Sequence, residues 1–217
     1  MDCAKAVGAR LARPHKSLSK MEGILKIWHR LPLLIAVPTT AGTGSETTLA
    51  AVITDADTHH KYAINDFNLI PDYAVLEPSV TYGLPPHLTA TTGMDALTHA
   101  IEGYTTKAAW EIPDMFHMEA IRLISENLRD AVANKPSGRE GMALAQYIAG
   151  MGFSNVGLGI DHSMAHTLSA HYDTPHGVAC AMLLPISMEF NRDYTGDRYR
   201  ACLLYTSPSP RDRSLSR

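Results

Sequence analysis

Two short segments of the chain carry acidic and imidazole side chains at helical spacing. Asp95 and His99 stand at positions i and i+4, and His162 and His166 repeat that spacing. On an α-helix such a pair lies on one face, close enough to bind a common ligand. A further histidine, His176, stands between a proline and a glycine. Together these side chains could hold a divalent metal ion.

The sequence around these histidines favours their burial. Segments 150–160 and 178–185 are apolar, so core-forming parts of the chain carry the imidazoles. A buried ionisable group must be paired, bound to a metal or neutral. One carboxylate with three imidazoles and no thiolate suits Fe²⁺, Zn²⁺, Ni²⁺ or Co²⁺. Two simpler interpretations stay open on spacing alone: a hydrogen-bonded Asp/His pair on a helix surface, and histidines satisfied within a packed core.

A loop of small and hydroxyl residues, 38–46 (PTTAGTGSE), follows the apolar run 31–37 (LPLLIAV). Such a run is typical of a buried parallel strand. Glycines let the backbone of the loop approach a ligand, and the hydroxyls can bond to phosphate or ribose. The loop is neither a G-x-G-x-x-G turn nor a P-loop. By itself it therefore indicates only a hydroxyl-rich turn that could serve a cofactor.

The character of the chain changes near Leu84. Before this point the sequence predicts a short helix and then strands that alternate with loops, as in an α/β nucleotide-binding domain. After it, helical patterns follow one another. The predicted helices are 2–11, 89–104, 112–133, 140–156, 162–170 and 178–190, with a break at 134–138, and the predicted strands are 31–37, 49–54 and 73–76.

These patterns divide the chain into three parts. Residues 1–84 are the expected α/β part and residues 85–205 the expected helical part. Residues 206–217 (TSPSPRDRSLSR) have too little apolar surface to order themselves. We expect a disordered tail there, either a solvated basic terminus or a non-native one.

Composition narrows the class of protein. The 217 residues are 45% hydrophobic and 19% charged, which is ordinary for a globular protein. A net charge of −3 gives no electrostatic case for binding nucleic acid or an anionic membrane. Cys3, Cys180 and Cys202 form no C-x-x-C pair, so the expected location is a reducing cytoplasm. The sequence shows no secretion signal, and no apolar run approaches the ~20 residues of a membrane span.

Four long strings carry a resemblance to a known family. They are LPLLIAVPTTAGTGSE, GLPPHLTATTGMDALTHAIEGY, GMALAQYIAGMGFSNVGLGIDHSMAH and YDTPHGVACAMLLP. In this order they resemble the iron-containing (group III) alcohol dehydrogenases, especially the branch of lactaldehyde reductases and propanediol or butanol dehydrogenases. The resemblance covers essentially residues 1–205. It implies an α/β plus all-α fold: a partial Rossmann-like dinucleotide-binding domain followed by a helical metal-binding domain, an architecture shared with dehydroquinate synthase.

The resemblance also implies roles for particular residues. It makes Asp95, His99, His162 and His176 the metal ligands, and it places His166 beside the nicotinamide and substrate as a proton-relay or orienting group. The residues expected to bind the cofactor are Asp2, Lys5, Thr39, Thr40, Gly42, Thr43, Ser45, Val52, Lys61 and Leu76. Asp2 and Lys5 resemble the end of the family's G-G-S-x-x-D-x-x-K stretch. The first three residues of that stretch, which hold the pyrophosphate, are absent here.

The implied chemistry is hydride transfer between a small alcohol or aldehyde and a nicotinamide cofactor. The metal, Fe²⁺ or alternatively Zn²⁺, acts as a Lewis acid that favours the alkoxide. Hydride passes to NAD⁺, with NADP⁺ also open, and the reverse reaction reduces the aldehyde. Lactaldehyde/1,2-propanediol is the first expected pair, and the full-length form is expected to be a homodimer. Because the ligands must be deprotonated, metal affinity should fall as the pH drops through the histidine range.

The chain also departs from the family. The first strands of the dinucleotide fold, the residue that discriminates NAD from NADP and the helical domain after Arg200 are missing. We therefore expect this fragment to bind dinucleotide poorly, to turn over slowly or not at all, and to expose sheet edges that favour aggregation. Two other functions stay open: a dehydroquinate synthase-like lyase, which also pairs NAD with a metal, and a non-catalytic metal-binding fragment of a longer enzyme.

Overall fold

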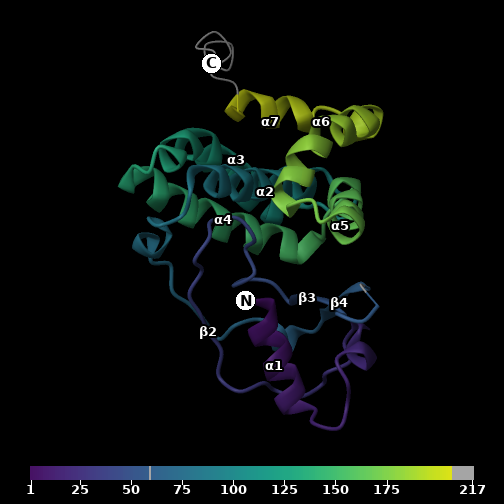
Figure 1. The fold of residues 1–217 in the computed structure, drawn as a ribbon. Helices are drawn as coiled ribbons and strands as arrows, with labels where there is room; N and C mark the ends of the chain where they lie inside the picture. Colours follow the sequence, from purple (N-terminus) through teal and green to yellow (C-terminus); the bar gives the residue numbers. More distant parts are fainter. Residues whose placement is uncertain (59, 207–217) are drawn as a thin grey trace.

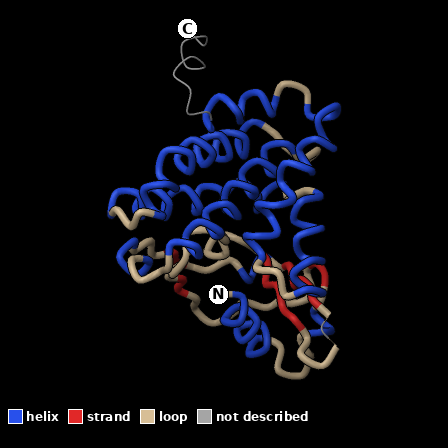
Figure 2. Tube along the Cα trace, turned by 45° about the horizontal axis from the view of Figure 1, so that its top comes forward, coloured by secondary structure: helices blue, strands red, loops and turns tan. Residues whose placement is uncertain are grey.

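The computed structural model describes residues 1–58 and 60–206, with side chains as far as residue 203. The helices that follow residue 85 pack together (Figure 1). Below them lies a smaller part that contains the first helix, the strands and long loops. The N-terminus lies where these two parts meet. Figure 2 shows that the strands are short and are confined to one end of the molecule. In the described ranges, no helix is both long enough and apolar enough to cross a bilayer.

The smaller part is built from one helix and two small sheets. Helix α1 spans Asp2–Ala12, and the strands are β1 (Gly23–Ile24), β2 (Ile35–Ala36), β3 (Ala50–Thr54), β4 (Lys61–Asn65) and β5 (Tyr73–Ala74). Strand β4 is central in the order β1-β4-β3, parallel to β1 and antiparallel to β3, while β2 and β5 form a parallel pair. Three 3₁₀ turns lie at Ser19–Met21, Phe67–Leu69 and Pro78–Thr81.

Strand β4 shows why these residues form a sheet. Its side chains alternate, so that Tyr62 and Ile64 are buried while their neighbours are partly exposed. This alternation is the period of a half-buried strand. Tyr62 and Ile64 pack with Ala9 of α1 and Ala51 of β3 in one apolar cluster, which ties the helix to the sheet. Strand β4 was not predicted, although polar and apolar residues alternate in its sequence.

The apolar run 31–37 differs from its prediction. A parallel ladder with β5 is present, but the strand is limited to Ile35–Ala36. Leu33, Ile35 and Val37 are 66%, 54% and 46% exposed, so the expected buried strand is wrong. The physical reason is that β2 pairs with β5 alone among the described strands, and its residues line an open cleft.

Six α-helices follow in the part of the chain that the structure describes. They are α2 (Pro86–Thr105), α3 (Glu111–Val132), α4 (Pro136–Val156), α5 (Ile160–Tyr172), α6 (His176–Thr195) and α7 (Arg198–Thr206). Each helix predicted after residue 84 is present, and most extend beyond the predicted ends. The predicted break is shorter than expected: Asn134 takes a left-handed conformation and Pro136 already occupies the first turn of α4. Helix α7 was not predicted, and the expected tail from residue 207 onward lies outside the described residues.

Helix α2 lies among the other helices and contacts α3, α4, α6 and α7. The hydroxyl-rich loop is held against α4 at Gly44, whose positive φ of 58° suits glycine. A β-carbon on Gly44 would lie 2.8 Å from the α-carbon of Gly150, and Gly44 N donates to Gln146 Oε1 over 2.9 Å. The packing therefore fixes the loop against α4, which in turn packs on α2, the helix that carries His99. The domain boundary at Leu84 stays a prediction.

Candidate metal centre

One carboxylate oxygen is the meeting point of three helices. Asp95 and His99 lie one turn apart on α2, His162 lies in the first turn of α5, and His176 begins α6. Around Asp95 Oδ1, the Nε2 atoms of His162, His176 and His99 lie at 3.4, 3.5 and 3.8 Å. The structure thus brings together all four residues expected to bind the metal. Their role as ligands stays a prediction.

The cluster is largely shielded from solvent. Asp95, His99 and His162 are 4%, 6% and 3% exposed, and His176 is half-buried. The ring of His99 stacks on Phe153 and on His162, with ring centroids 4.4 Å apart in both pairs. Stacking on both sides restricts the rotation of His99, so its Nε2 atom is held on the side of Asp95.

Burial and charge set the protonation of the cluster. Burial, only partly offset by Asp95, lowers the pKa of His99 to about 3. Burial opposes ionisation of Asp95 as well, but the attraction of His99 and the other imidazoles outweighs it and lowers the pKa of the carboxyl. Burial also disfavours a charge on His162, yet hydrogen bonds to Asp95, Cys180 and Glu102 raise its pKa well above the usual value. A carboxylate beside a neutral imidazole offers the lone pairs that a metal ion binds.

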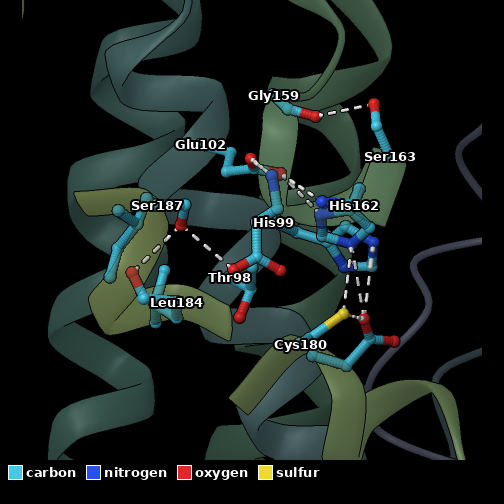
Figure 3. A network of polar contacts seen from close by, with 12 residues as sticks. Thr98, His99, Glu102, Gly159, His162, Ser163, Cys180, Leu184 and Ser187 are labelled. Carbon is cyan, nitrogen blue, oxygen red and sulfur yellow. Dashed lines mark hydrogen bonds and ion pairs between the residues drawn. The ribbon is translucent and has the colours of Figure 1, made fainter. Parts of the chain in front are cut away.

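Glu102 supports His162 from behind, and the sequence analysis missed it. Its Oε2 atom lies 2.6 Å from His162 Nδ1, and its Oε1 accepts from the backbone N–H of Asp161 over 2.7 Å (Figure 3). A hydrogen bond at Nδ1 leaves Nε2 available on the opposite side of the ring, which is how carboxylates orient metal-binding histidines. The signal was present, because Glu102 follows His99 by three residues on the same helical face.

Cys180 was also missed. It lies on α6 one turn after His176 and is fully buried. Its Sγ atom is 3.6 Å from Asp95 Oδ1, 3.7 Å from His176 Nε2 and 4.0 Å from His162 Nε2. A thiol thus lies beside the expected donors: Asp95, His162, His176 and Cys180 each offer an atom, and these atoms all lie within 4.8 Å of one another. The i, i+4 spacing from His176 could have indicated this.

His166 lies on α5 one turn after His162. Its ring stacks on that of His176, with the centroids 4.7 Å apart. Burial lowers the pKa of His166 to about 4, with a further contribution from His176. His166 also lines the cleft that leads to the cluster, so its imidazole stands beside the cluster at the cleft wall.

The cleft has a volume of about 920 Å³ and runs from the cluster to the hydroxyl-rich loop. Seven of the residues expected to bind the cofactor line it: Asp2, Thr39, Thr40, Thr43, Ser45, Val52 and Lys61. Among the described residues, Lys5, Gly42 and Leu76 do not contribute to its lining. Gly42 lies instead against α2, where a β-carbon would be 2.7 Å from the carbonyl oxygen of Thr92.

Asp2 and Lys5 tie the start of the chain to the cleft wall. Asp2 accepts hydrogen bonds from Ser45 Oγ (2.7 Å) and from the backbone N–H of Val52 (3.0 Å). Lys5 is fully buried, and its Nζ donates to the carbonyls of Thr48 (2.7 Å) and Ala50 (3.0 Å). These bonds satisfy a buried ammonium with fixed oxygens. Thr48 and Ala50 line the cleft, so Lys5 fixes the backbone of the cleft wall without lining the cleft itself.

Two protein-family models match nearly the whole chain. "Iron-containing alcohol dehydrogenase" matches residues 1–78, and "Fe-containing alcohol dehydrogenase family, C-terminal" matches residues 89–207. The chain belongs to the iron-containing alcohol dehydrogenase family. This confirms the resemblance carried by the four strings.

Individual relatives agree with this assignment. The chain is 48% identical over 200 residues to the lactaldehyde reductase of Escherichia coli (strain K12), a match that covers 92% of this chain and 52% of that protein. It superposes on a 1,3-propanediol oxidoreductase with a TM-score of 0.92 at 41% identity, covering 96% of this chain and 55% of that one. An iron-containing alcohol dehydrogenase from Thermotoga maritima gives a TM-score of 0.89 at 31% identity, covering 96% and 57%. The chain thus spans about half the length of the curated relatives it matches.

Proposed function

We propose that this chain carries the metal-binding half of the active site of an oxidoreductase that transfers a hydride between NAD(H) and a small alcohol or aldehyde. The observation that supports this best is the convergence of three imidazole Nε2 atoms within 3.4–3.8 Å of one oxygen of the buried Asp95. Lactaldehyde/1,2-propanediol is the preferred substrate pair. The similarity to a lactaldehyde reductase and a 1,3-propanediol dehydrogenase favours short diols and their aldehydes.

The residues present fit a divalent ion. Asp95, His99, His162 and His176 would hold it, as Fe²⁺ or alternatively Zn²⁺. The Nε2 atoms of the three histidines lie 3.4–3.8 Å from Asp95 Oδ1, longer than the ~2.7–2.9 Å of a strong charged hydrogen bond and close to the separation of two donors that share an ion. When bound, the ion supplies Lewis acidity that polarises the substrate oxygen.

The chain's own residues orient this centre. Asp95 contributes the negative charge that offsets a cation in a buried place. Glu102 holds the Nδ1 side of His162, so that Nε2 faces Asp95. Phe153 stacks on His99 and covers the cluster with an apolar surface that excludes water. His166, which lines the cleft, would accept or return the hydroxyl proton of a substrate.

The cofactor would occupy the other end of the cleft. The hydroxyls of Thr39, Thr40 and Thr43 can bond to ribose or phosphate oxygens, and the Lys61 ammonium can pair with a phosphate. The bound nicotinamide supplies the hydride acceptor. NAD(H) is the proposed cofactor, with NADP(H) as the alternative. The proposal also includes the dehydroquinate synthase-like arrangement of the two domains and a cytoplasmic homodimer for a full-length enzyme.

Metal analysis tests this proposal. In anaerobically purified protein we expect about one bound metal per chain, and clearly less in His162→Ala and His176→Ala. His87→Ala is the matched control, because His87 is an exposed histidine of α2 outside the cluster and its loss should leave the metal content unchanged. Unchanged metal in both cluster variants would refute the site. Turnover of 1,2-propanediol with NAD⁺ then tests the activity, which we expect to be low or absent in this chain.

A further inference from the structure

We propose that the Cys180 thiol is an additional metal donor of this centre, so that the ion is held by sulfur as well as by oxygen and nitrogen. This inference rests on the proposed metal site and extends its donor set. In Figure 3 the Cys180 sulfur points toward the imidazole of His162, with dashed lines to its partners. Its partners at hydrogen-bonding range, Asp95, His162 and His176, are the same residues that would hold the ion.

The distances fit a common centre. Around a tetrahedral ion with bonds of about 2.1 Å to nitrogen or oxygen and about 2.3 Å to sulfur, N and O donors stand about 3.4 Å apart, and S stands about 3.6 Å from each of them. The observed separations from Asp95 Oδ1 are 3.4 Å to His162 and 3.5 Å to His176. Those from Cys180 Sγ are 3.6 Å to Asp95, 3.7 Å to His176 and 4.0 Å to His162. Cys180 Sγ therefore lies at about the separation expected of a further donor that shares an ion with Asp95, His162 and His176.

Besides the cluster, the Cys180 thiol has the Asp161 carboxyl as a polar neighbour, and its other surroundings are apolar. Cys180 is fully buried, and it packs in an apolar cluster with Ala165 and Ala179, flanked by Leu168 and Leu183. These neighbours cannot accept a hydrogen bond from the thiol through their side chains. Its helical position, four residues after His176, puts both side chains on the face of α6 that meets Asp95. Packing thus directs the sulfur at the cluster.

Binding through sulfur changes which ion the site prefers. When the ion binds, the S–H bond breaks, a sulfur–metal bond forms and the proton leaves to solvent, with no change in oxidation state. Thiolate is a softer donor than imidazole or carboxylate, and it favours Zn²⁺ and Co²⁺ over harder ions. We therefore expect Cys180→Ser to weaken Zn²⁺ binding at least about tenfold and to weaken Mn²⁺ binding much less.

Cobalt spectroscopy tests the thiol separately from the rest of the site. Protein loaded with one equivalent of Co²⁺ should show the near-ultraviolet sulfur-to-cobalt charge-transfer band, and the band should be lost in Cys180→Ser while cobalt remains bound. Cys3→Ser, which removes an exposed cysteine, should keep the band. Zinc-loaded wild type should show a sulfur neighbour at about 2.3 Å by X-ray absorption, a measurement that requires no variant to fold.

The outcomes distinguish the two proposals. If cobalt binds without a charge-transfer band, and zinc shows only nitrogen and oxygen neighbours, the thiol proposal is wrong while the Asp/His site stands. A band that persists in Cys180→Ser and disappears in Cys3→Ser also overturns it. If neither ion binds to the wild type, the proposed metal centre itself fails, and the role of Cys180 fails with it.

Discussion

At the scale of single residues, the orientation of His162 depends on a carboxylate behind it. Glu102 bonds to His162 Nδ1 and to two backbone N–H groups at the start of α5. We expect Glu102→Gln to weaken metal binding about 10- to 100-fold, because the uncharged amide holds the ring less firmly and makes it a weaker donor. Chelator competition gives the affinity. Glu140→Gln, which alters an exposed glutamate of α4, is the control, and an unchanged affinity in Glu102→Gln would show that the contact is structural only.

The buried ammonium of Lys5 makes a prediction about pH. Burial lowers the pKa of Lys5 from 10.5 to about 8, against the opposing attraction of Asp2 and Glu46. At pH values between these two pKa values, Lys5 is protonated in the unfolded chain and largely neutral in the folded chain. The free energy of unfolding therefore rises with pH in this window. Relative to Lys5→Met, the free energy of unfolding of the wild type should increase by up to about 3 kcal/mol from about pH 7 to about pH 10. Urea titrations at both pH values measure this difference, and a constant difference would contradict the pKa shift.

Spacing alone revealed the histidines but could not select among them. The i, i+4 rule found Asp95 with His99 and His162 with His166, because a helix puts such pairs on one face. It could not show that three helices converge on Asp95, since that depends on tertiary packing. Cys180 stands four residues after His176 and Glu102 three residues after His99, so both share a helical face with a histidine of the cluster. They were missed because the sequence analysis sought imidazole donors and treated the cysteines as a question of disulfides.

At the scale of elements, one histidine fixes how three helices pack. His117 of α3 is fully buried, and its ring lies against Gly103 of α2 and Gly152 of α4. A β-carbon at either glycine would overlap the imidazole. Gly103 immediately follows Glu102 on α2. The close contact of Gly103 with His117 therefore helps to fix the position of the Glu102 carboxylate, which bonds to His162. The apolar pattern predicted the helices, but these close contacts are set by side-chain shapes on different helices and are not visible in one pattern.

This contact predicts that methyl groups are not tolerated at the two glycines. Alanine normally stabilises a helix by about 1 kcal/mol relative to glycine. We expect Gly152→Ala instead to destabilise the protein by about 1–3 kcal/mol, because the ring of His117 has to shift within a packed core. Thermal or urea unfolding measures the change. Gly83→Ala is the control, since nothing lies within 4 Å of its β-carbon position, and a stabilised Gly152→Ala would mean that the helices separate easily.

The strands were harder to predict than the helices. The predicted strands 49–54 and 73–76 correspond to β3 and β5, whereas β1 and β4 were not predicted. Strand β1 has two residues, too few to show a period. The run 31–37 was read as buried because it is continuously apolar. Its exposure along the cleft depends on which elements lie nearby, and a local sequence cannot show that.

At the scale of the whole molecule, the proposed ligands lie on three different helices. Asp95 belongs to α2, His162 to α5 and His176 to α6, and α2 already contacts α6. Chelation of the metal should therefore lower the melting temperature. At a metal concentration about 100 times the dissociation constant, bound ion adds about 2.7 kcal/mol of stability. Scanning calorimetry with and without a chelator measures this, and His162→Ala should melt at one temperature in both conditions. Equal melting of the wild type in both would argue against a bound ion.

The convergence of helices on one carboxylate has a consequence for how the protein loses its structure over time. An ion shared by α2, α5 and α6 acts as a cross-link that forms only after the three helices have docked. It therefore stabilises the folded chain and contributes little to the folding process itself. When the ion is lost, a negatively charged Asp95 remains buried against imidazoles that compete for protons, and the three helices lose their common attachment. Slow loss of metal and slow loss of structure should then proceed together, and resupply of the ion should rescue only those molecules whose helices have not yet separated.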